Sequence, residues 1–368
     1  MRLQKLQLYN YRNYEDLKLD LEGEVFCLLG KNGSGKTNLL DAIYYLSFTK
    51  SFLNATDSFN VRTGESVFSI KGHFVRDNRE AEVFCSMQAG SKKIVRENGN
   101  DYQKLSHHIG KYPVVLVAPN DIELIWDGSE VRRKFVDGLI SQIDGAYLEQ
   151  LIVYNHYLKM RNAALKQFAE RGKTDYDLLE TYNRPLAAAG DFIAQTRRQF
   201  LDVLRPALQK FYRFLSNNPA ETTDVQYKTD ADQATMAALL HANLARDLAM
   251  QRTSTGIHRD DFSFLLDGQE LKRFGSQGQQ KSFLIGLKLA EFEIIHQKKG
   301  FKPLLLLDDI FDKLDDDRIA RLIQLINEET FGQLFITDAR PDRTRELVRH
   351  VTRQMRKLLV EAGTVRPA

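Results

Sequence analysis

The pattern of apolar and polar residues divides the chain into a strand-rich beginning, a helical middle and a mixed end. Residues 3–29 have the pattern of strands, and the continuous apolar run at 25–29 is typical of a strand buried on both faces. Apolar residues then recur at helical spacing over 39–46. Shorter strand-like runs follow at 66–70, 81–87 and 114–117. The first half of a βαβ unit is therefore predicted near the N-terminus.

The middle of the chain is predicted to be mainly helical. Residues 144–215 are helical in period, and we expect Pro185 and Pro206 to interrupt them because proline lacks an amide hydrogen. A second helical stretch is predicted at 231–250, and a hairpin at 262–274 around Asp267-Gly268. The remaining predicted elements are a helix with an apolar stripe from 283 to 294, strands at 303–307 and 333–336, a helix at 318–327 and a terminal helix.

A glycine-rich segment lies between the predicted strand at 25–29 and the helix after it. Its residues fit G-x-x-x-x-G-K-[ST]: Gly30, Lys31, Asn32, Gly33, Ser34, Gly35, Lys36 and Thr37. Glycines let the backbone curl so that N–H groups point at nucleotide phosphates, and the helix dipole favours the same anion. Lys36 would place its charge between the β- and γ-phosphates, and the Thr37 hydroxyl would bind Mg²⁺. The segment predicts a phosphate-binding loop.

Two acidic residues follow a second apolar strand far downstream. Asp308 and Asp309 come directly after residues 304–307, where an open α/β sheet places its ligands. Asp308 would hold Mg²⁺ opposite Thr37, and Asp309 would orient or deprotonate the attacking water. Lys36 and Asp308 lie 272 residues apart (308 − 36), which is more than a simple kinase or GTPase needs. A large segment is therefore inserted between the two halves of the site.

Composition excludes some classes of protein and leaves others open. The 52 Lys and Arg against 49 Asp and Glu give a formal charge of +3, which is too mild to decide on a nucleic-acid partner. Two cysteines exclude a disulfide scaffold and a Cys-rich zinc module. No apolar run reaches the roughly 20 residues that span a bilayer, and the first residues lack the apolar core of a signal peptide. We expect a cytoplasmic protein without a membrane partner.

A second candidate anion site lies 32 residues before Asp308 (308 − 276), at the start of the helix with the apolar stripe. The segment Ser276-Gln277-Gly278-Gln279 combines a hydroxyl, a permissive glycine and amide side chains at a helix N-terminus. It resembles the S-G-G-Q signature of ABC-type ATPases, with Gln277 in place of the first of the two glycines. The resemblance implies that Ser276, Gly278 and Gln279 bind the γ-phosphate held by another copy, in an ATP-dependent homodimer.

Two further segments bear on this resemblance. Residues 310–315 resemble the short loop that contacts the partner's site in ABC-type ATPases. Many of these ATPases carry a switch histidine after the next strand, whereas this chain has Thr337 and Asp338 there. One of these two residues would have to replace the histidine as the group that senses the γ-phosphate.

Among ABC-type ATPases, the chain resembles the RecF family of DNA repair proteins over nearly its whole length. It contains no sustained heptads, so the long arm of an SMC protein is not expected. The similar segments are residues 6–14, 118–121, 132–137, 157–162, 256–261 and 276–280. Residues 50–53 (Lys-Ser-Phe-Leu) depart from the His-Arg pair that is typical of the family.

The resemblance implies an α/β fold, a P-loop NTPase like an ABC ATPase head. A β-rich, ATP-binding lobe I (1–117 plus 300–368) would surround an inserted, mainly helical lobe II (118–299) that carries the signature. The implied protein is a weak, DNA-stimulated ATPase that uses ATP and Mg²⁺. It would bind single-stranded and duplex DNA at gaps or junctions, and would help RecO- and RecR-like mediators load RecA in gap repair, replication restart and the SOS response. The alternatives are a coupling ATPase of a membrane transporter and an AAA-like or phosphotransferase enzyme.

Three assignments stay open on the sequence alone. Arg12 would contact the bound nucleotide by resemblance to SMC-like heads, or it is a solvated arginine at a strand end. His258 and its neighbour Arg259 have either a structural role or a role near the signature. Basic residues recur at four-residue intervals near the C-terminus, as a solvated helix face or a DNA phosphate contact: Arg345, Arg349, Arg353 and Lys357, with Arg356 beside them.

Overall fold

The computed structural model describes residues 1–310, 314–338, 351 and 354–368, which form two compact units. Unit 1 comprises residues 1–121, 211–218 and 277–368, and unit 2 comprises 122–210 and 219–276. The predicted lobe boundary at residue 300 differs from this division, because helix α9 (Gln277–Lys299) belongs to unit 1. The helix packs on strand β8 (Val114–Val117), and its buried residues extend along most of its length. An apolar stripe predicts that a helix is buried, but not which layer it covers.

The centre of unit 1 is a largely parallel sheet with the strand order β15-β14-β3-β13-β12-β8. Its remaining strands are β3 (Val25–Leu29), β12 (Leu304–Leu307), β13 (Leu334–Asp338), β14 (Met355–Glu361) and β15 (Thr364–Pro367). All neighbours pair in parallel except β15, which is antiparallel to β14. The predicted strands at 25–29 and 303–307 are confirmed. Because β3 and β12 flank β13, the segments after all three strands meet at one edge.

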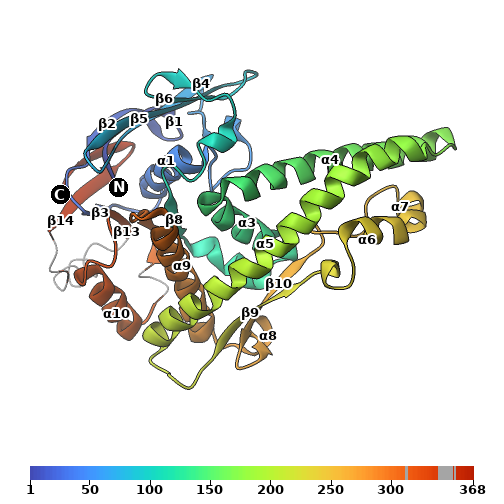
Figure 1. The fold of residues 1–368 in the computed structure, drawn as a ribbon. Coiled ribbons are helices and arrows are strands. Elements are labelled where there is room, and N and C mark those ends of the chain that lie inside the picture. The colour runs from blue at the N-terminus through green and yellow to red at the C-terminus, as the bar shows by residue number, and fades with distance from the viewer. Residues whose placement is uncertain (311–313, 339–350, 352–353) are drawn as a thin grey trace. The chain divides into compact units, whose positions relative to one another are not determined.

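An antiparallel sheet covers one face of the central sheet, with helix α1 (Lys36–Phe48) between them (Figure 1). Its order is β2-β1-β4-β5-β6-β7. The strands are β1 (Arg2–Tyr11), β2 (Tyr14–Asp20), β4 (Val67–Arg76), β5 (Arg79–Gln88), β6 (Ile94–Glu97) and β7 (Asn100–Asp101). One hydrophobic core joins the two sheets and α1. The buried Gln333 side chain also links them, through hydrogen bonds to the backbone N–H and carbonyl of Leu3.

The C-terminal part of unit 1 departs from prediction. The terminal helix is wrong for residues 355–368, which form the β14–β15 hairpin. Arg356 and Lys357 are adjacent in β14 and so point to opposite faces of the sheet, which rules out one basic stripe through both. The other members of the predicted stripe, Arg345, Arg349 and Arg353, lie outside the described residues. Helix α10 (Asp316–Asn327) is present where a helix was predicted.

Unit 2 is mainly helical, as predicted, with one small sheet. Its helices are α2 (Glu123–Trp126), α3 (Ser129–Ile143), α4 (Gly145–Arg171), α5 (Tyr176–Ser216), α6 (Met236–Ala242), α7 (Leu244–Met250) and α8 (Leu271–Phe274). Its strands are β9 (Thr223–Lys228), β10 (Asp261–Leu266) and β11 (Gln269–Glu270). The hairpin around Asp267 and Gly268 is confirmed, with φ of 50° and 77° in the left-handed conformation that this two-residue turn requires. Its predicted end at residue 274 is wrong, because residues 271–274 form α8. Short 3₁₀ turns lie at Asp57–Asn60, Leu105–His107, Pro119–Ile122 and Asp230–Asp232.

The predicted interruption of the long helix is wrong. Helix α5 continues through both Pro185 and Pro206 and extends from unit 2 into unit 1. Buried apolar residues flank both prolines, including Leu186 and Leu204, and this burial outweighs the roughly 3 kcal/mol that each proline costs a helix. The predicted helix at 231–250 is instead divided into α6 and α7 at Asn243.

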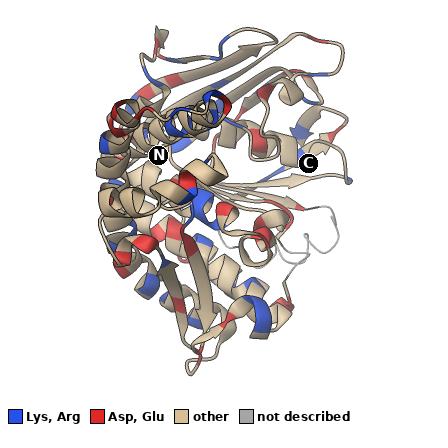
Figure 2. Cartoon of the chain, turned by 90° about the vertical axis from the view of Figure 1, so that its right-hand side faces the viewer, with Lys and Arg blue, Asp and Glu red and all other residues tan. Residues whose placement is uncertain are grey.

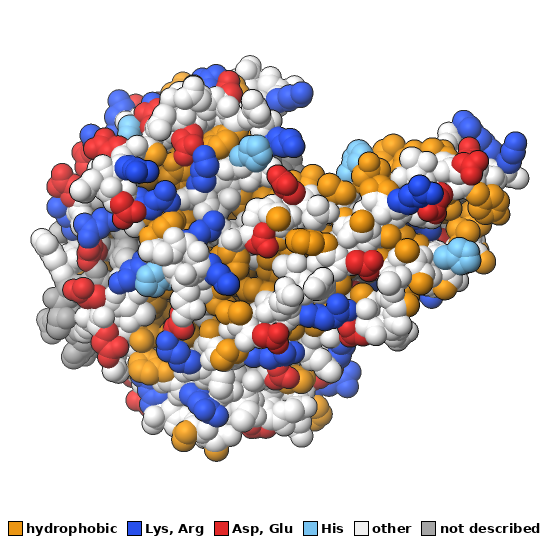
Figure 3. Space-filling view, viewed as in Figure 1, with side chains coloured by type: hydrophobic (Ala, Val, Ile, Leu, Met, Phe, Trp, Pro, Cys, Tyr) orange, Lys and Arg blue, Asp and Glu red, His pale blue; other side chains and the backbone are white. Residues whose placement is uncertain are grey.

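The surface carries mixed charge and some exposed apolar side chains. Acidic and basic residues are interspersed over the elements visible in Figure 2, in keeping with the net charge of +3. Hydrophobic side chains gather over α4 and α5 in Figure 3. Among the helices that the structure describes, none is long and apolar enough to cross a membrane.

Candidate nucleotide-binding site

The glycine-rich segment forms a tight loop between β3 and α1. A Cβ atom on Gly30 would lie 2.3 Å from the carbonyl oxygen of Val360 in β14, so the loop can follow β3 only with glycine there. Gly35 has φ of 116° and caps the N-terminus of α1, a conformation that L side chains rarely adopt. The predicted strand, loop and helix are thus present in the predicted order.

Lys36 folds back over the loop that precedes it. Its Nζ atom donates to the carbonyl oxygens of Gly30 at 2.7 Å and Lys31 at 3.0 Å. Burial lowers the pKa of Lys36, and the carboxylates of Asp309 and Asp308 partly offset this effect. The ammonium group is therefore held among backbone carbonyls beside two acids, where an arriving phosphate would gain a charge-assisted contact.

Thr37 and Asp308, which are distant in sequence, meet at the edge of the central sheet. The Thr37 hydroxyl donates to both carboxylate oxygens of Asp308, at 3.0 and 3.1 Å. Thr337, at the end of β13, donates its own hydroxyl to Asp308 Oδ1 at 2.7 Å. Burial raises the pKa of Asp308, whereas the hydrogen bonds from Thr337 and Thr37 and the charge of Lys36 lower it. Two hydroxyl groups thus hold one buried carboxylate in a single orientation.

These side chains surround a cavity of about 150 Å³. It is lined by Asn32, Gly33, Gly35, Lys36, Thr37, Asn38, Asp308, Asp309 and Thr337. Of the predicted loop residues, Gly30, Lys31 and Ser34 lie in the same loop but are not among those that line the cavity. The structure therefore brings five of the eight loop residues and both predicted acids to one cavity.

The donor set fits Mg²⁺ bound together with a phosphate. Thr37 and Asp308 supply oxygen ligands about 3 Å apart, close to the separation of two adjacent ligands around Mg²⁺. No group of three His, Cys, Asp or Glu side chains in the described part of the chain could hold a metal ion alone. Mg²⁺ commonly takes one or two protein ligands and completes its shell with water and substrate phosphate, which this arrangement allows.

The turn of residues 11–14, of which the sequence analysis singled out only Arg12, braces the phosphate loop. Tyr11 donates to Asp41 of α1 at 2.7 Å, and Tyr14 donates to the carbonyl oxygen of Gly35 at 2.9 Å. Asn13 lies between them, donates to the carbonyl oxygen of Ser34 at 3.1 Å and accepts from Asn38 at 2.7 Å. These contacts could have been predicted from the sequence Tyr-Arg-Asn-Tyr, which places four consecutive side chains that form hydrogen bonds at the turn between the first two strands.

Arg12 belongs to the same brace. Its guanidinium group lies 3.0 Å from the fully buried Asp41 carboxylate and also donates to Ser51 and Asn60. It is not among the described residues that line the cavity. The nucleotide contact predicted for Arg12 thus stays a prediction, while the solvated alternative is wrong because only 14% of its side chain is exposed.

The signature segment lies at the boundary between the units. Ser276 is the last residue of unit 2, whereas Gly278 and Gln279 lie in the first turn of α9 in unit 1. Ser276 and Gln277 are exposed, and the preceding Phe274 is 65% exposed. Within unit 1, neither Gly278 nor Gln279 is among the described lining residues of the cavity. The contact of Ser276, Gly278 and Gln279 with a second copy stays a prediction.

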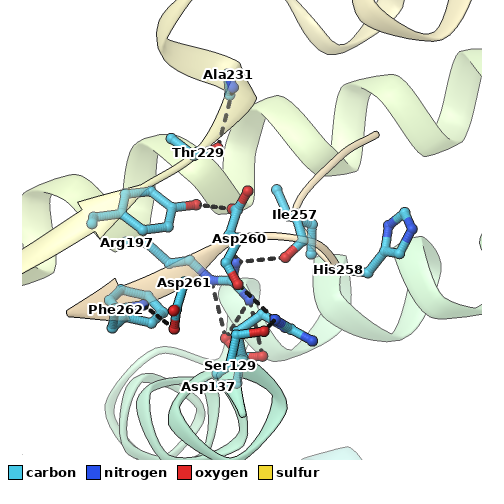
Figure 4. Close-up of polar contacts among 12 residues, drawn as sticks. Ser129, Asp137, Arg197, Thr229, Ala231, Ile257, His258, Asp260, Asp261 and Phe262 are labelled. Carbon is cyan, nitrogen blue, oxygen red and sulfur yellow. Dashed lines mark hydrogen bonds and ion pairs between the residues drawn. The ribbon is translucent and has the colours of Figure 1, made fainter. Parts of the chain in front are cut away.

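In unit 2, the loop of residues 256–261 is held by a buried polar network (Figure 4). Arg197 of α5 donates to the carbonyl oxygen of Ile257 at 3.0 Å and to the Asp260 carboxylate at 3.1 Å. His258 Nδ1 lies 2.8 Å from the Tyr154 hydroxyl, and burial lowers the pKa of His258 to about 4. These contacts support the structural role for His258, which was one of the two open assignments.

Comparisons with known proteins agree with this geometry. The profile of the RecF/RecN/SMC N terminal domain family matches residues 2–359. A "DNA replication and repair protein RecF" from Flavobacterium johnsoniae is 44% identical over 349 residues, covering 95% of this chain and 97% of the relative. The protein of that name from Cytophaga hutchinsonii is 43% identical over 365 residues, covering 99% and 96%.

Solved structures show the same fold. A structure of the recombination mediator protein RecF with ATP, in the RecFOR pathway, has a TM-score of 0.89 and 32% identity, covering 100% of this chain and 97% of that one. The Smc head domain from Pyrococcus furiosus, with a TM-score of 0.57 and 15% identity, shares the ABC-type head fold alone. With a family profile over nearly the whole chain and full-length relatives above 40% identical, this chain belongs to the RecF family of P-loop ATPases.

Proposed function

We propose that this chain is an ATP-dependent DNA-binding protein of gap repair and replication restart. Its family membership supports this role, since the relatives are named DNA replication and repair proteins. The observation that carries the proposal is the cavity at which Lys36, Thr37 and Asp308 meet, because these groups suit a triphosphate with Mg²⁺. A coupling ATPase of a transporter would need a membrane partner, and nothing in the comparisons favours one.

Each group of the cavity has a proposed task. Lys36 and the amides of residues 30–37 hold the phosphates, and Thr37 and Asp308 hold Mg²⁺. Bound Mg²⁺ supplies positive charge that stabilises the charge developing on the phosphoryl oxygens. Asp309 orients the attacking water and accepts its proton, supported by its position in the cavity lining. Asp309 is one methylene shorter than the glutamate that many ATPases of this architecture carry at this position. The shorter side chain is compatible with slow, DNA-stimulated turnover, in which ATP acts as a switch for assembly.

We further propose that ATP joins two copies of the chain. Ser276, Gly278 and Gln279 of one copy would contact the γ-phosphate held by the other, supported by the exposure of Ser276 and by the helix that begins beside it. The dimer would bind junctions of single-stranded and duplex DNA in the cytoplasm. RecO- and RecR-like mediators would then cooperate with it to load RecA, which also supports the SOS response.

The test is fluorescence anisotropy of a labelled gapped DNA, titrated with the protein with and without ATP and Mg²⁺. We expect tighter binding with ATP and Mg²⁺, and loss of that gain in Lys36→Met, because the phosphates lose their charged partner. Ser276→Arg should bind ATP but form no ATP-dependent dimer in analytical ultracentrifugation.

The outcomes separate the parts of the proposal. DNA binding that is indifferent to ATP in the wild-type protein would refute the ATP-dependent role. Dimers that persist in Ser276→Arg would refute the trans contact while leaving the nucleotide site intact. If the protein binds ATP but no DNA, the result would favour a transporter-coupling ATPase or a phosphotransferase instead.

A further inference from the structure

Thr337 is a residue of the candidate site whose side chain contacts both Asp308 and Asp309. It lies in β13, between β3, which leads into the phosphate loop, and β12, which leads into the two acids. The side chain is buried, with 1% exposed. Its hydroxyl donates to Asp308 Oδ1 at 2.7 Å and accepts from the backbone N–H of Asp309 at 2.9 Å. One hydroxyl therefore contacts both acids.

The two contacts use the hydroxyl in two different ways. A threonine hydroxyl has one hydrogen, and here that hydrogen points at the Asp308 carboxylate. The oxygen lone pair accepts the Asp309 amide, at a residue whose φ of 49° lies in the left-handed region. The same side chain thus orients the carboxylate that suits Mg²⁺ and secures the strained backbone that carries the candidate base.

We propose that Thr337 is a positioning residue for the pair Asp308 and Asp309, and that it does not sense the γ-phosphate directly. The inference rests on the proposed function of this cavity and deepens it. A sensor would need its hydrogen for the phosphate, whereas the Thr337 hydrogen is already donated to a buried carboxylate, a bond stronger than one between neutral groups. Thr337 acts on the reaction only through the two acids.

A purely structural role is the competing explanation, because any buried hydroxyl needs a partner. The two roles differ in what the loss of the hydroxyl changes. A structural hydroxyl would affect the stability of the protein and every mode of nucleotide binding alike. A positioning hydroxyl would affect the steps that need Asp308 and Asp309, namely Mg²⁺-dependent binding and hydrolysis.

The experiment compares Thr337→Val, which keeps the shape and removes the hydroxyl, with Thr337→Ser, which keeps the hydroxyl. Affinity for a fluorescent ATP analogue is measured in the full-length protein with Mg²⁺ and with EDTA, beside kcat, KM and the melting temperature. In Thr337→Val we expect affinity with Mg²⁺ to fall about tenfold and kcat about 10- to 100-fold, as for the loss of one hydrogen bond to a charged group. Affinity in EDTA should change less than twofold, and Thr337→Ser should restore all values to within about threefold.

Four results would overturn the inference. Wild-type behaviour of Thr337→Val in Mg²⁺ overturns the inference, and so does an equal loss of affinity in Mg²⁺ and EDTA with a lowered melting temperature. If Thr337→Val fails to fold, a Thr337→Ser variant that still loses Mg²⁺-dependent binding also overturns it, because the hydroxyl is present. A wild-type protein that binds no ATP with Mg²⁺ refutes the proposed function itself, and this inference with it.

Discussion

Replacing Arg197 by methionine should destabilise unit 2 more than any nearby surface change. The Arg197 side chain is 1% exposed and forms ion pairs with Asp137 at 2.8 Å and Asp260 at 3.1 Å. Its guanidinium group also donates to the Tyr147 hydroxyl. It donates as well to the carbonyl oxygen of Ile257 (Figure 4). Methionine fills a similar volume but leaves two carboxylates in the protein interior without their cation.

The magnitude follows from the burial of those carboxylates. Removing one partner of a buried ion pair costs about 3–5 kcal/mol, and we expect about 4 kcal/mol at pH 7.5. Burial already raises the pKa of Asp260, although Tyr227 and Arg197 lower it in part. Without Arg197 the pKa should rise further, so that protonation relieves the unpaired charge as the pH falls. The loss of stability in Arg197→Met should therefore be smaller at pH 5 than at pH 7.5.

The assay can be confined to unit 2. Trp126 is the single tryptophan of the chain and lies in unit 2, so its fluorescence during urea denaturation reports the unfolding of this unit. Arg198→Met is the matched control: the neighbouring arginine is 39% exposed, and its ion pair with Asp232 contributes at most about 1 kcal/mol. A difference of less than about 1 kcal/mol between Arg197→Met and Arg198→Met would refute the reasoning.

Three further predictions follow from the geometry. The pKa of His258 is lowered to about 4, so the unfolded chain takes up this proton at a higher pH than the folded protein, and stability should fall by up to about 3 kcal/mol between pH 6.5 and 4. His258→Gln should remove this dependence of stability on pH, whereas His241→Gln, at an exposed histidine, should keep it. Equal pH dependence of the two variants in urea titrations would contradict the assignment. Asn13→Ala removes two hydrogen bonds at the phosphate loop and should weaken ATP binding about tenfold in calorimetry; unchanged affinity would mean that the brace is dispensable. Phe274→Ser should weaken ATP-dependent dimers about tenfold in ultracentrifugation without affecting ATP binding by single copies, whereas Phe59→Ser, at a residue 70% exposed, should not; equal effects would argue against contact near the signature.

Each half of the candidate nucleotide site could be located from its own stretch of sequence, although Gly30, Lys31 and Ser34 do not line the cavity. The phosphate loop carries its whole signal within residues 30–37, and the flanking strand and helix have unambiguous apolar patterns. Asp308 could be predicted as well, because a buried parallel strand delivers the residue after it to the ligand-binding edge. The bracing role of the turn of residues 11–14 was missed because its hydrogen bonds join it to residues 21 positions away.

Local rules failed where burial or distant pairing decided the structure. Prolines predict helix ends, yet α5 continues through two of them because its buried apolar residues flank both. Basic residues at four-residue intervals predicted a terminal helix, yet residues 355–361 form β14. This strand pairs in parallel with β3, from the opposite end of the chain, and that pairing is invisible to any local window of sequence.

The order of the strands explains why position 337 bears on both acids. Since Ile336 of β13 pairs with Leu307, the last residue of β12, position 337 must stand beside the residues that follow β12. An apolar residue there would leave the Asp309 amide without its present partner, at about 1–3 kcal/mol, and would leave Asp308 Oδ1 with the hydrogen bond from Thr37 alone. A residue that both donates and accepts hydrogen bonds satisfies the two groups at once, and threonine also suits a strand. The sheet order, which the linear sequence conceals, therefore restricts the chemistry of this one side chain more tightly than its neighbours in sequence do.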